Sequence, residues 1–295
     1  MPTQNIELAD PVTYMKLNNI ATSTRDPLAI APYSRQKIDF TEREINPLVY
    51  PANDWYDLLF KDFAVNHRAN FNISGGGKVA RYYIAATANQ DNGILNVAGK
   101  NDFNNNINLK KYLLRSNINV NITPTTEAVV RLHGTFDDYR GPIDGGSVLY
   151  KKVMQSDPAL FPAYYPSTEE TSYIKHIMFG NHDEANYINP YADMVKGYRD
   201  YTKSMMLAQF ELNQDLDLIT KGLDVRALFS TKRYSYFDVS RNYNPFYYNV
   251  TNYNRKENTF ELQRLNPGEG TEYLDYSEGQ KQIFASSYGE FAINY

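Results

Sequence analysis

The feature that most restricts the fold of this sequence is a period-two alternation of apolar and polar side chains over stretches of about ten residues or more. In residues 79–90, Tyr82 and Ile84 fall on one face of an extended chain, while Arg81 and Asn89 fall on the other. Successive side chains of a β-strand point to opposite faces, so the pattern predicts a strand with one apolar and one polar face. Its length suits a tilted strand that crosses a lipid bilayer.

Seven stretches of this kind occur along the chain. We expect strands at 65–74, 79–90, 106–122, 127–136, 201–217, 223–239 and 281–295. Short turns at 75–78, 123–126 and 220–222 alternate with long loops at 91–105, 138–200 and 240–279. This asymmetry is the topology of an outer-membrane barrel, whereas a soluble β-sandwich has no reason to show it. We therefore predict an all-β chain that forms an antiparallel transmembrane β-barrel segment.

The composition agrees with a barrel wall. Only 42% of the residues are apolar, yet the chain has 26 Tyr and 15 Phe. Every second residue of a membrane barrel faces a wet lumen, and tyrosine suits the boundary between lipid and water. No run of about 18 apolar residues occurs, so a membrane-spanning helix is excluded and any membrane crossing must use a barrel. A tyrosine-rich secreted β protein would have a similar composition.

Charge and cysteine content exclude other classes. The net charge is -4 and Lys/Arg runs are absent, which argues against nucleic-acid binding. The chain has no cysteine, so disulfides and thiolate metal sites are excluded. Residues 1–10 contain neither the basic nor the apolar part of a signal peptide. For an exported protein, we therefore expect this sequence to lack the true N-terminus.

The chain divides into two parts by pattern. Residues 1–62 form a helical and irregular segment of extracellular-loop type, and residues 63–295 form a partial β-barrel with long loops. Asp10 before Pro11 predicts a capped helix that runs to about residue 24. We expect further helices at 35–44, near 55–61 around Trp55, and at 147–155 within the longest loop.

Two loop motifs have simple structural interpretations. Gly75-Gly76-Gly77-Lys78 lacks the spacing of a phosphate-binding loop and is typical of a hairpin turn. His176 and His182-Asp183-Glu184 do not have the spacing of a standard metal site, so we interpret them as polar loop residues.

Neighbouring acids suggest the carboxylate pair of a glycoside hydrolase. The candidates are Asp137 with Asp138, and Asp215 with Asp217. Adjacent residues on a strand face opposite sides, and the second pair lies beside a turn, so solvated acids are the better interpretation. We expect no catalytic residue, no bound metal and no cofactor, and we expect that the chain is not an enzyme.

Several sequence blocks resemble a known family. Residues 53–60 (NDWYDLLF), 70–76 (NFNISGG), 89–94 (NQDNGI) and 114–119 (LRSNIN) resemble, in order and spacing, the start of the barrel in SusC/RagA-type TonB-dependent transporters of Bacteroidetes. Further similarity at 157–158 and 189–192 extends it over most of the chain. Residues 8–14 look like the family segment that follows the plug and the first barrel strand.

The resemblance implies a 22-stranded barrel in the bacterial outer membrane with an N-terminal plug domain. It also implies a TonB box, a SusD-like surface lipoprotein that caps the barrel, and import of glycans or peptides. The chain would match roughly the second to the eighth strand. We expect it to lack the plug, the TonB box, the signal peptide and about two thirds of the barrel. Its partners would be the SusD-like lipoprotein, the TonB complex through the missing N-terminal part, the substrate and outer-membrane lipid.

The polar faces of the strands would then line the lumen and contact the plug or the substrate path. The expected lumen-facing residues are Arg81, Lys111, Arg115, Asn117, Glu127 and Arg131. At the base of the largest loop we predict substrate contacts from Tyr139, Arg140 and Asp144.

Two alternatives are kept. A soluble secreted β-sandwich that binds carbohydrate would form a stable monomer in water. A glycoside hydrolase would bring two carboxylates together, about 5 to 10 Å apart, in a cleft.

Overall fold

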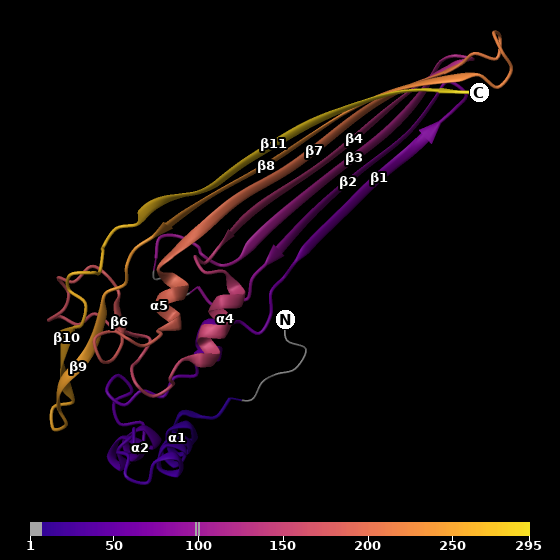
Figure 1. Cartoon of the computed structure of the whole chain (residues 1–295). Coiled ribbons are helices and arrows are strands. Elements are labelled where there is room, and N and C mark those ends of the chain that lie inside the picture. Colours follow the sequence, from indigo (N-terminus) through magenta and orange to yellow (C-terminus); the bar gives the residue numbers. More distant parts are fainter. Residues whose placement is uncertain (1–7, 98, 100) are drawn as a thin grey trace.

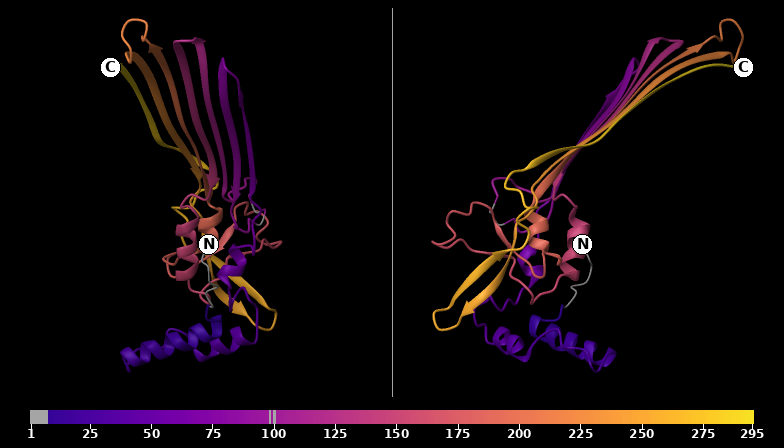
Figure 2. Two further views of the ribbon diagram at one scale, coloured as in Figure 1. Left: turned by 90° about the vertical axis from the view of Figure 1, so that its right-hand side faces the viewer. Right: turned by 60° about the vertical axis from the view of Figure 1, so that its left-hand side comes forward.

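The computed structural model describes residues 8–97, 99 and 101–295. A long, curved sheet forms an arm, and the long connections between its strands gather at one end of that arm (Figures 1 and 2). We call these connections, at 93–107, 142–196 and 243–274, the loop body. The N-terminal helices lie beyond the loop body, at the end of the molecule away from the arm (Figure 2).

The arm is a seven-stranded antiparallel sheet within the described residues, in the order β1-β2-β3-β4-β7-β8-β11. We call it the main sheet. Its strands are β1 (His67–Gly76), β2 (Ala80–Asn92), β3 (Asn108–Thr123), β4 (Thr126–Gly141), β7 (Gly197–Asp215), β8 (Asp224–Asn242) and β11 (Asp275–Asn294). All seven predicted strands are present and pair antiparallel, so the predicted fold class is confirmed. The described residues form an open sheet with β1 and β11 at its edges.

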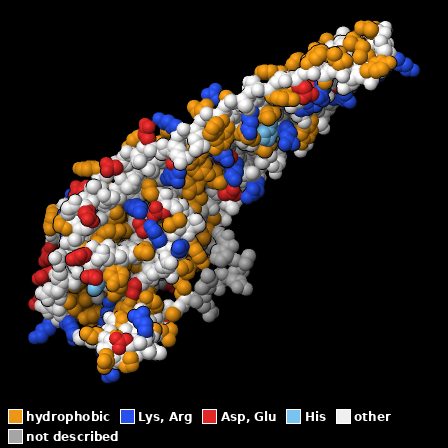
Figure 3. Space-filling model, in the orientation of Figure 1, with side chains coloured by type: hydrophobic (Ala, Val, Ile, Leu, Met, Phe, Trp, Pro, Cys, Tyr) orange, Lys and Arg blue, Asp and Glu red, His pale blue; other side chains and the backbone are white. Residues whose placement is uncertain are grey.

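The register of the main sheet produces two chemically different faces. Residues directly opposite each other in paired strands project to the same side. The apolar face carries large side chains that are between 39% and 66% exposed. These are Phe71, Ile73, Tyr82, Tyr112, Leu114, Leu132, Phe136, Met206, Phe210, Phe229, Ile283, Phe291 and Ile293. Hydrophobic side chains lie at the surface along the length of the arm (Figure 3).

The strands extend further toward the loop body than the alternation predicts. β4 continues to Gly141 and β7 begins at Gly197, whereas the predicted loop covers 138–200. Polar residues occupy both faces here, for example Tyr139 and Arg140, so the alternation ends although the backbone ladder continues. At the opposite end the connections are short, and Gly222 adopts a φ of 87° in the last of them.

The predicted helices are present with small changes at their ends. They are α1 (Pro11–Arg25), α2 (Arg35–Glu42), α3 (Trp55–Leu59) and α4 (Gly146–Gln155). Asp10 caps α1 by accepting hydrogen bonds from the backbone N–H groups of Val12 and Thr13, each at 3.0 Å. Among the described residues, no helix combines the length and the apolar character that crossing a membrane requires.

The loop body holds elements that the sequence did not predict. A second sheet, which we call the small sheet, has the order β10-β9-β6-β5. Its strands are β5 (Tyr164–Tyr165), β6 (Met178–Gly180), β9 (Tyr247–Asn254) and β10 (Thr259–Arg264). Strands as short as β5 and β6 show no measurable alternation, which is why they were expected to be loop. Helix α5 (Pro190–Val195) was also missed, although Asn189 before Pro190 is a standard helix start.

The largest buried apolar cluster lies in the loop body and not in the arm. It joins Trp55, Leu59, Phe161, Phe179 and Tyr191 with side chains of α4 and α5. The indole N–H of Trp55 donates to the carbonyl oxygen of Asp157 at 2.9 Å, which ties the N-terminal segment to the longest connection. The sequence predicted a helix around Trp55, and in the structure Asp54 caps α3 and Trp55 is buried.

Tyr191 places an unpaired hydroxyl group inside this buried cluster. Its ring is 1% exposed, its hydroxyl has no hydrogen-bond partner, and burial raises its pKa to about 12. We expect Tyr191→Phe to raise the thermal midpoint of the detergent-solubilised protein, because an unpaired buried hydroxyl costs about 1–3 kcal/mol. Tyr191→Ala serves as the matched variant and should lower stability by about 3–5 kcal/mol. A lower midpoint for Tyr191→Phe would contradict this.

Candidate functional site

The polar face of the main sheet is the candidate functional surface. The register places all six predicted lumen-facing residues on this face, opposite the apolar face. They are Arg81, Lys111, Arg115, Asn117, Glu127 and Arg131. Cross-strand neighbours such as Asn117 and Arg131 confirm that the residues share one side of the sheet. Whether that side faces a lumen stays a prediction.

A network of charged and amide side chains crosses the polar face near the short turns. Glu127 accepts hydrogen bonds from Arg81 at 3.2 Å and from Asn119 at 3.1 Å. Arg131, on the same strand as Glu127, pairs with Glu211 on the neighbouring strand β7 at 2.6 Å. On β8 and β11, Arg226 pairs with Glu290, and the hydroxyl of Tyr288 donates to the same carboxylate at 2.8 Å. The arginines and glutamates alternate across the strands, so the charges on this part of the face are largely balanced.

Tyrosines dominate the other end of the polar face, next to the loop body. Tyr139 and Tyr201 lie opposite each other on β4 and β7, with ring centroids 4.7 Å apart and ring planes 12° apart. Tyr236 extends the row, 5.7 Å from Tyr201. A pocket of about 180 Å³ opens here, lined by these rings, by Arg199 and by residues 142–145. We call Tyr139, Tyr201 and Tyr236 the tyrosine row.

Arg199 stands beside the tyrosine row and is held by a buried carboxylate. Its guanidinium lies 2.7 Å from Asp238, which is 5% exposed. The second oxygen of Asp238 accepts from the backbone N–H of Gln280 at 2.7 Å. This contact occupies the bulge in β11, where a Cβ on Gly279 would lie 2.3 Å from the Asp238 carboxyl carbon. A side chain at position 279 would therefore displace the Asp238 carboxylate from this contact.

The structure does not bring the three predicted substrate residues to one place. Tyr139 and Asp144 line the same pocket, but Arg140 projects from the opposite face of β4. Arg140 makes two hydrogen bonds to Asp200, at 2.7 and 2.8 Å. The guanidinium of Arg140 therefore already has a carboxylate partner within the protein.

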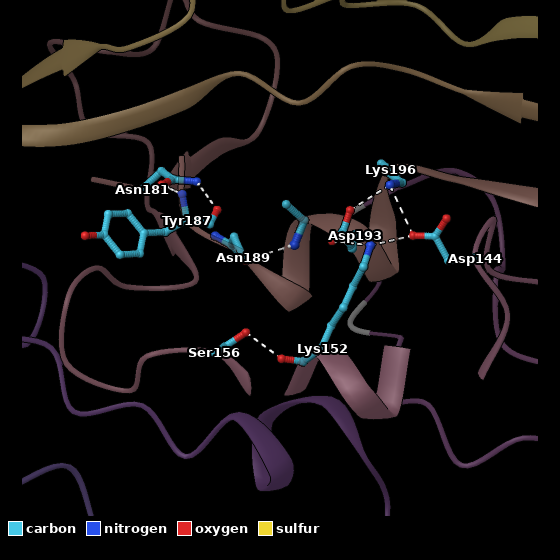
Figure 4. A network of polar contacts seen from close by, with 9 residues as sticks. Asp144, Lys152, Ser156, Asn181, Tyr187, Asn189, Asp193 and Lys196 are labelled. Carbon is cyan, nitrogen blue, oxygen red and sulfur yellow. Dashed lines mark hydrogen bonds and ion pairs between the residues drawn. The ribbon is translucent and has the colours of Figure 1, made fainter. Parts of the chain in front are cut away.

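Asp144 belongs to a group of four charged side chains inside the loop body (Figure 4). Lys152 contacts Asp144 at 2.6 Å and Asp193 at 2.8 Å, and Lys196 contacts Asp193 at 2.6 Å and Asp144 at 3.4 Å. Two lysines and two aspartates balance each other and join residue 144 to α4 and α5. Burial alone would raise the pKa of Asp144, but the hydrogen bond from Lys152 and the charge of Lys196 outweigh it and lower that pKa.

The lowered pKa of Asp144 predicts a pH dependence of stability. A carboxyl group whose pKa is lowered on folding stabilises the protein above its unfolded pKa of about 3.9, and the contribution is lost as the pH falls through the lower folded value. We expect Asp144→Asn to be less stable than wild type at neutral pH, with the difference shrinking below about pH 4. Thermal midpoints of the detergent-solubilised protein between pH 7 and pH 2.5 measure this. Asp183→Asn, in an exposed turn, is the control.

Sequence reasoning missed Tyr201, Tyr236, Arg199 and Asp238. Each lies on a strand that the alternation predicted, or within a few residues of one, but nothing local distinguishes it from its neighbours. The signal is the register, which sets Tyr201 opposite Tyr139 and Asp238 opposite Tyr201. That information is not contained in any single strand.

The acidic pairs do not form a hydrolase site in the described structure. Asp137 and Asp138 project to opposite faces of β4. Asp217 accepts from the backbone N–H of Gly222 at 2.7 Å, so this carboxylate organises the turn between β7 and β8. Within the described residues, no group of three or more His, Cys, Asp or Glu is arranged to hold a metal ion.

Two known proteins are similar to this chain. No family model matches the chain. The solved RagAB peptide transporter is similar with a TM-score of 0.48 and 14% identity, over 79% of this chain and 26% of that chain. The TonB-dependent receptor P26 of Formosa agariphila is 24% identical over 171 residues, which is 57% of this chain and 15% of the receptor.

The chain is similar in sequence to a TonB-dependent receptor. The resemblance to TonB-dependent receptors that the sequence blocks predicted is therefore confirmed. The two similar proteins are named as a receptor and a transporter, and neither name denotes an enzyme. The chain spans only 15% of the receptor's length, so the activity of a whole TonB-dependent receptor is a proposal for this chain.

Proposed function

We propose that this chain forms part of the wall of a TonB-dependent importer in the bacterial outer membrane. The short turns would face the periplasm and the loop body would lie outside, where a SusD-like lipoprotein delivers the substrate. The observation that carries the proposal is the two-faced main sheet. One face exposes large apolar side chains along much of its length, and the other carries paired charges and amides.

This pattern separates the proposal from its rivals. A β-sandwich buries one face of each sheet against a second sheet. Here the small sheet lies in the loop body, away from the arm (Figure 1). An apolar face of this length needs lipid or another apolar partner, because monomeric soluble proteins rarely expose such surfaces. A barrel wall provides the lipid on one side and water on the other.

Adjacent residues on β3 provide a direct test. This sequence has no cysteine, so an introduced cysteine is the only thiol within it, and labelling of the unaltered protein gives the background. In outer membranes from cells that carry the changes in the chromosomal gene, Arg115→Cys should react with a charged, water-soluble maleimide. Leu114→Cys should react with a lipid-soluble maleimide and resist the charged one. Equal labelling of both positions by the charged reagent would refute the proposal that the main sheet is part of a barrel wall.

Two further positions report the orientation. Tyr173→Cys, 76% exposed in the loop body, should be labelled by the charged maleimide on intact cells. Leu218→Cys, 94% exposed in the turn between β7 and β8, should be labelled only after the outer membrane is permeabilised. The opposite result would place the long loops in the periplasm.

For the substrate, we favour a glycan over a peptide. The charges beside the tyrosine row are already paired within the protein: Arg199 with Asp238, and Asp144 with Lys152 and Lys196. Little free charge is left for the termini and ionised side chains of a peptide. Aromatic rings and hydroxyls suit the apolar faces and hydroxyl groups of sugars. Tyr139 is the contact residue that we favour, while Arg140 and Asp144 would act by positioning their neighbours.

Removal of Tyr139 tests the substrate contact. An aromatic contact worth about 0.5–1.5 kcal/mol predicts that Tyr139→Ala weakens binding about 2- to 12-fold. The measurement is binding of a fluorescently labelled mixture of neutral oligosaccharides to outer-membrane vesicles, beside a labelled tryptic peptide mixture. Tyr112→Ala, on the apolar face, is the matched control and should bind as wild type does. Peptide binding that depends on Tyr139 would replace the glycan proposal.

A further inference from the structure

His176 is a nearly buried histidine in a largely exposed segment. Residues 166–175 connect β5 to β6 and lie mostly at the surface, but the His176 side chain is only 9% exposed. Its ring stacks on Phe246, with centroids 4.1 Å apart and planes 30° apart. The histidine therefore joins this exposed segment to the start of β9 in the small sheet.

Both ring nitrogens of His176 are engaged. Nε2 lies 2.7 Å from the hydroxyl of Tyr248 on β9, and Nδ1 lies 3.1 Å from Glu272, in the connection between β10 and β11. Arg264 on β10 donates its Nε–H to the Tyr248 oxygen at 3.0 Å. With the neutral imidazole, the Tyr248 hydroxyl can donate its own proton to Nε2 while Nδ1 donates its hydrogen to Glu272, so all three groups are paired. We assign this neutral form to the contact because the ring is nearly buried.

A second proton on the ring disturbs that arrangement. Nε2 would become a donor, so Tyr248 would lose the acceptor for its proton. The groups that face the ring are Glu272, which favours the cation, and Arg264, which opposes it, with Tyr248 and Phe246 uncharged. Burial is the largest influence and lowers the pKa of His176; the hydrogen bond to Glu272 opposes this, and Arg264 adds to the lowering.

The direction of the pH effect follows from this balance. We call the contacts described above the closed form, and a state in which the ring is released to water the open form. Because the pKa of His176 is lower in the closed form, the neutral ring stabilises the closed form at and above the free pKa of about 6.5. As the pH falls below that value, the open form takes up the proton first and gains stability. Acid therefore shifts the contact toward the open form.

We propose that His176 is an acid-released latch that holds residues 166–177 and the segment 265–274 against the start of β9 in the small sheet. At neutral pH the latch is closed. At mildly acidic pH it opens and frees both segments on the surface of the loop body. The latch is a property of the loop body itself, so it stands whether or not the chain is part of an importer.

Neighbouring backbone bonds make the release measurable. The N–H of Thr271 donates to the carbonyl of Asn244 at 2.9 Å, and the N–H of Leu265 donates to Tyr247 at 2.8 Å. Hydrogen exchange followed by mass spectrometry, on the chromosomally encoded protein in its native membrane or soluble fraction, reports these amides. After correction for the intrinsic rate, we expect protection of 265–274 to fall about tenfold between pH 7.5 and pH 5, equivalent to about 1.4 kcal/mol.

His176→Gln is the decisive variant, because glutamine retains hydrogen bonding but does not titrate in this range. Its protection should not change with pH, whereas the control His182→Gln should keep the wild-type response. Constant protection in the wild type, or a pH response that persists in His176→Gln, would overturn the latch. If His176→Gln does not fold, exchange at the imidazole C2 of the wild type gives the titration midpoint, and a value at or above about 6.5 overturns the proposal.

Discussion

The register of the main sheet is the constraint on which the rest of this molecule depends. A slip of one residue between any two strands would move apolar side chains to the polar face and charges to the apolar face. The pairing shifts register at two places: between Asn121 and Thr123, beside the short turn that joins β3 to β4, and between Glu278 and Lys281 in β11. At the bulge in β11 the backbone N–H of Gln280 donates to Asp238, and Asp238 in turn holds Arg199 beside the tyrosine row.

Stability and function are placed in different parts of the chain. The arm has many backbone hydrogen bonds but exposes its side chains on both faces, so lipid or a partner must cover its apolar side. The loop body has its own core around Phe161 and Tyr191, its own sheet and a balanced group of four charges. The four charges join Asp144, which lines the pocket at the tyrosine row, to α4 and α5.

The sequence predicted much of the arm and little of the site. Alternation located all seven strands of the main sheet, and it assigned Arg81, Glu127 and Arg131 to one face correctly. The cap at Asp10 located α1. Prediction was weaker where both faces are polar, as at Tyr139 and Arg140, and in segments as short as β5 and β6. There the period that distinguishes a strand from a loop is too brief to detect.

The sequence by itself thus determined the two-faced strands, because a strand's faces follow from its own order of residues. Only the tertiary structure decided which residues meet. It set Tyr201 against Tyr139, joined Asp144 to lysines of two helices, and placed His176 between Glu272 and Tyr248. These contacts join residues up to 96 positions apart, and they depend on register and loop packing that no local pattern records.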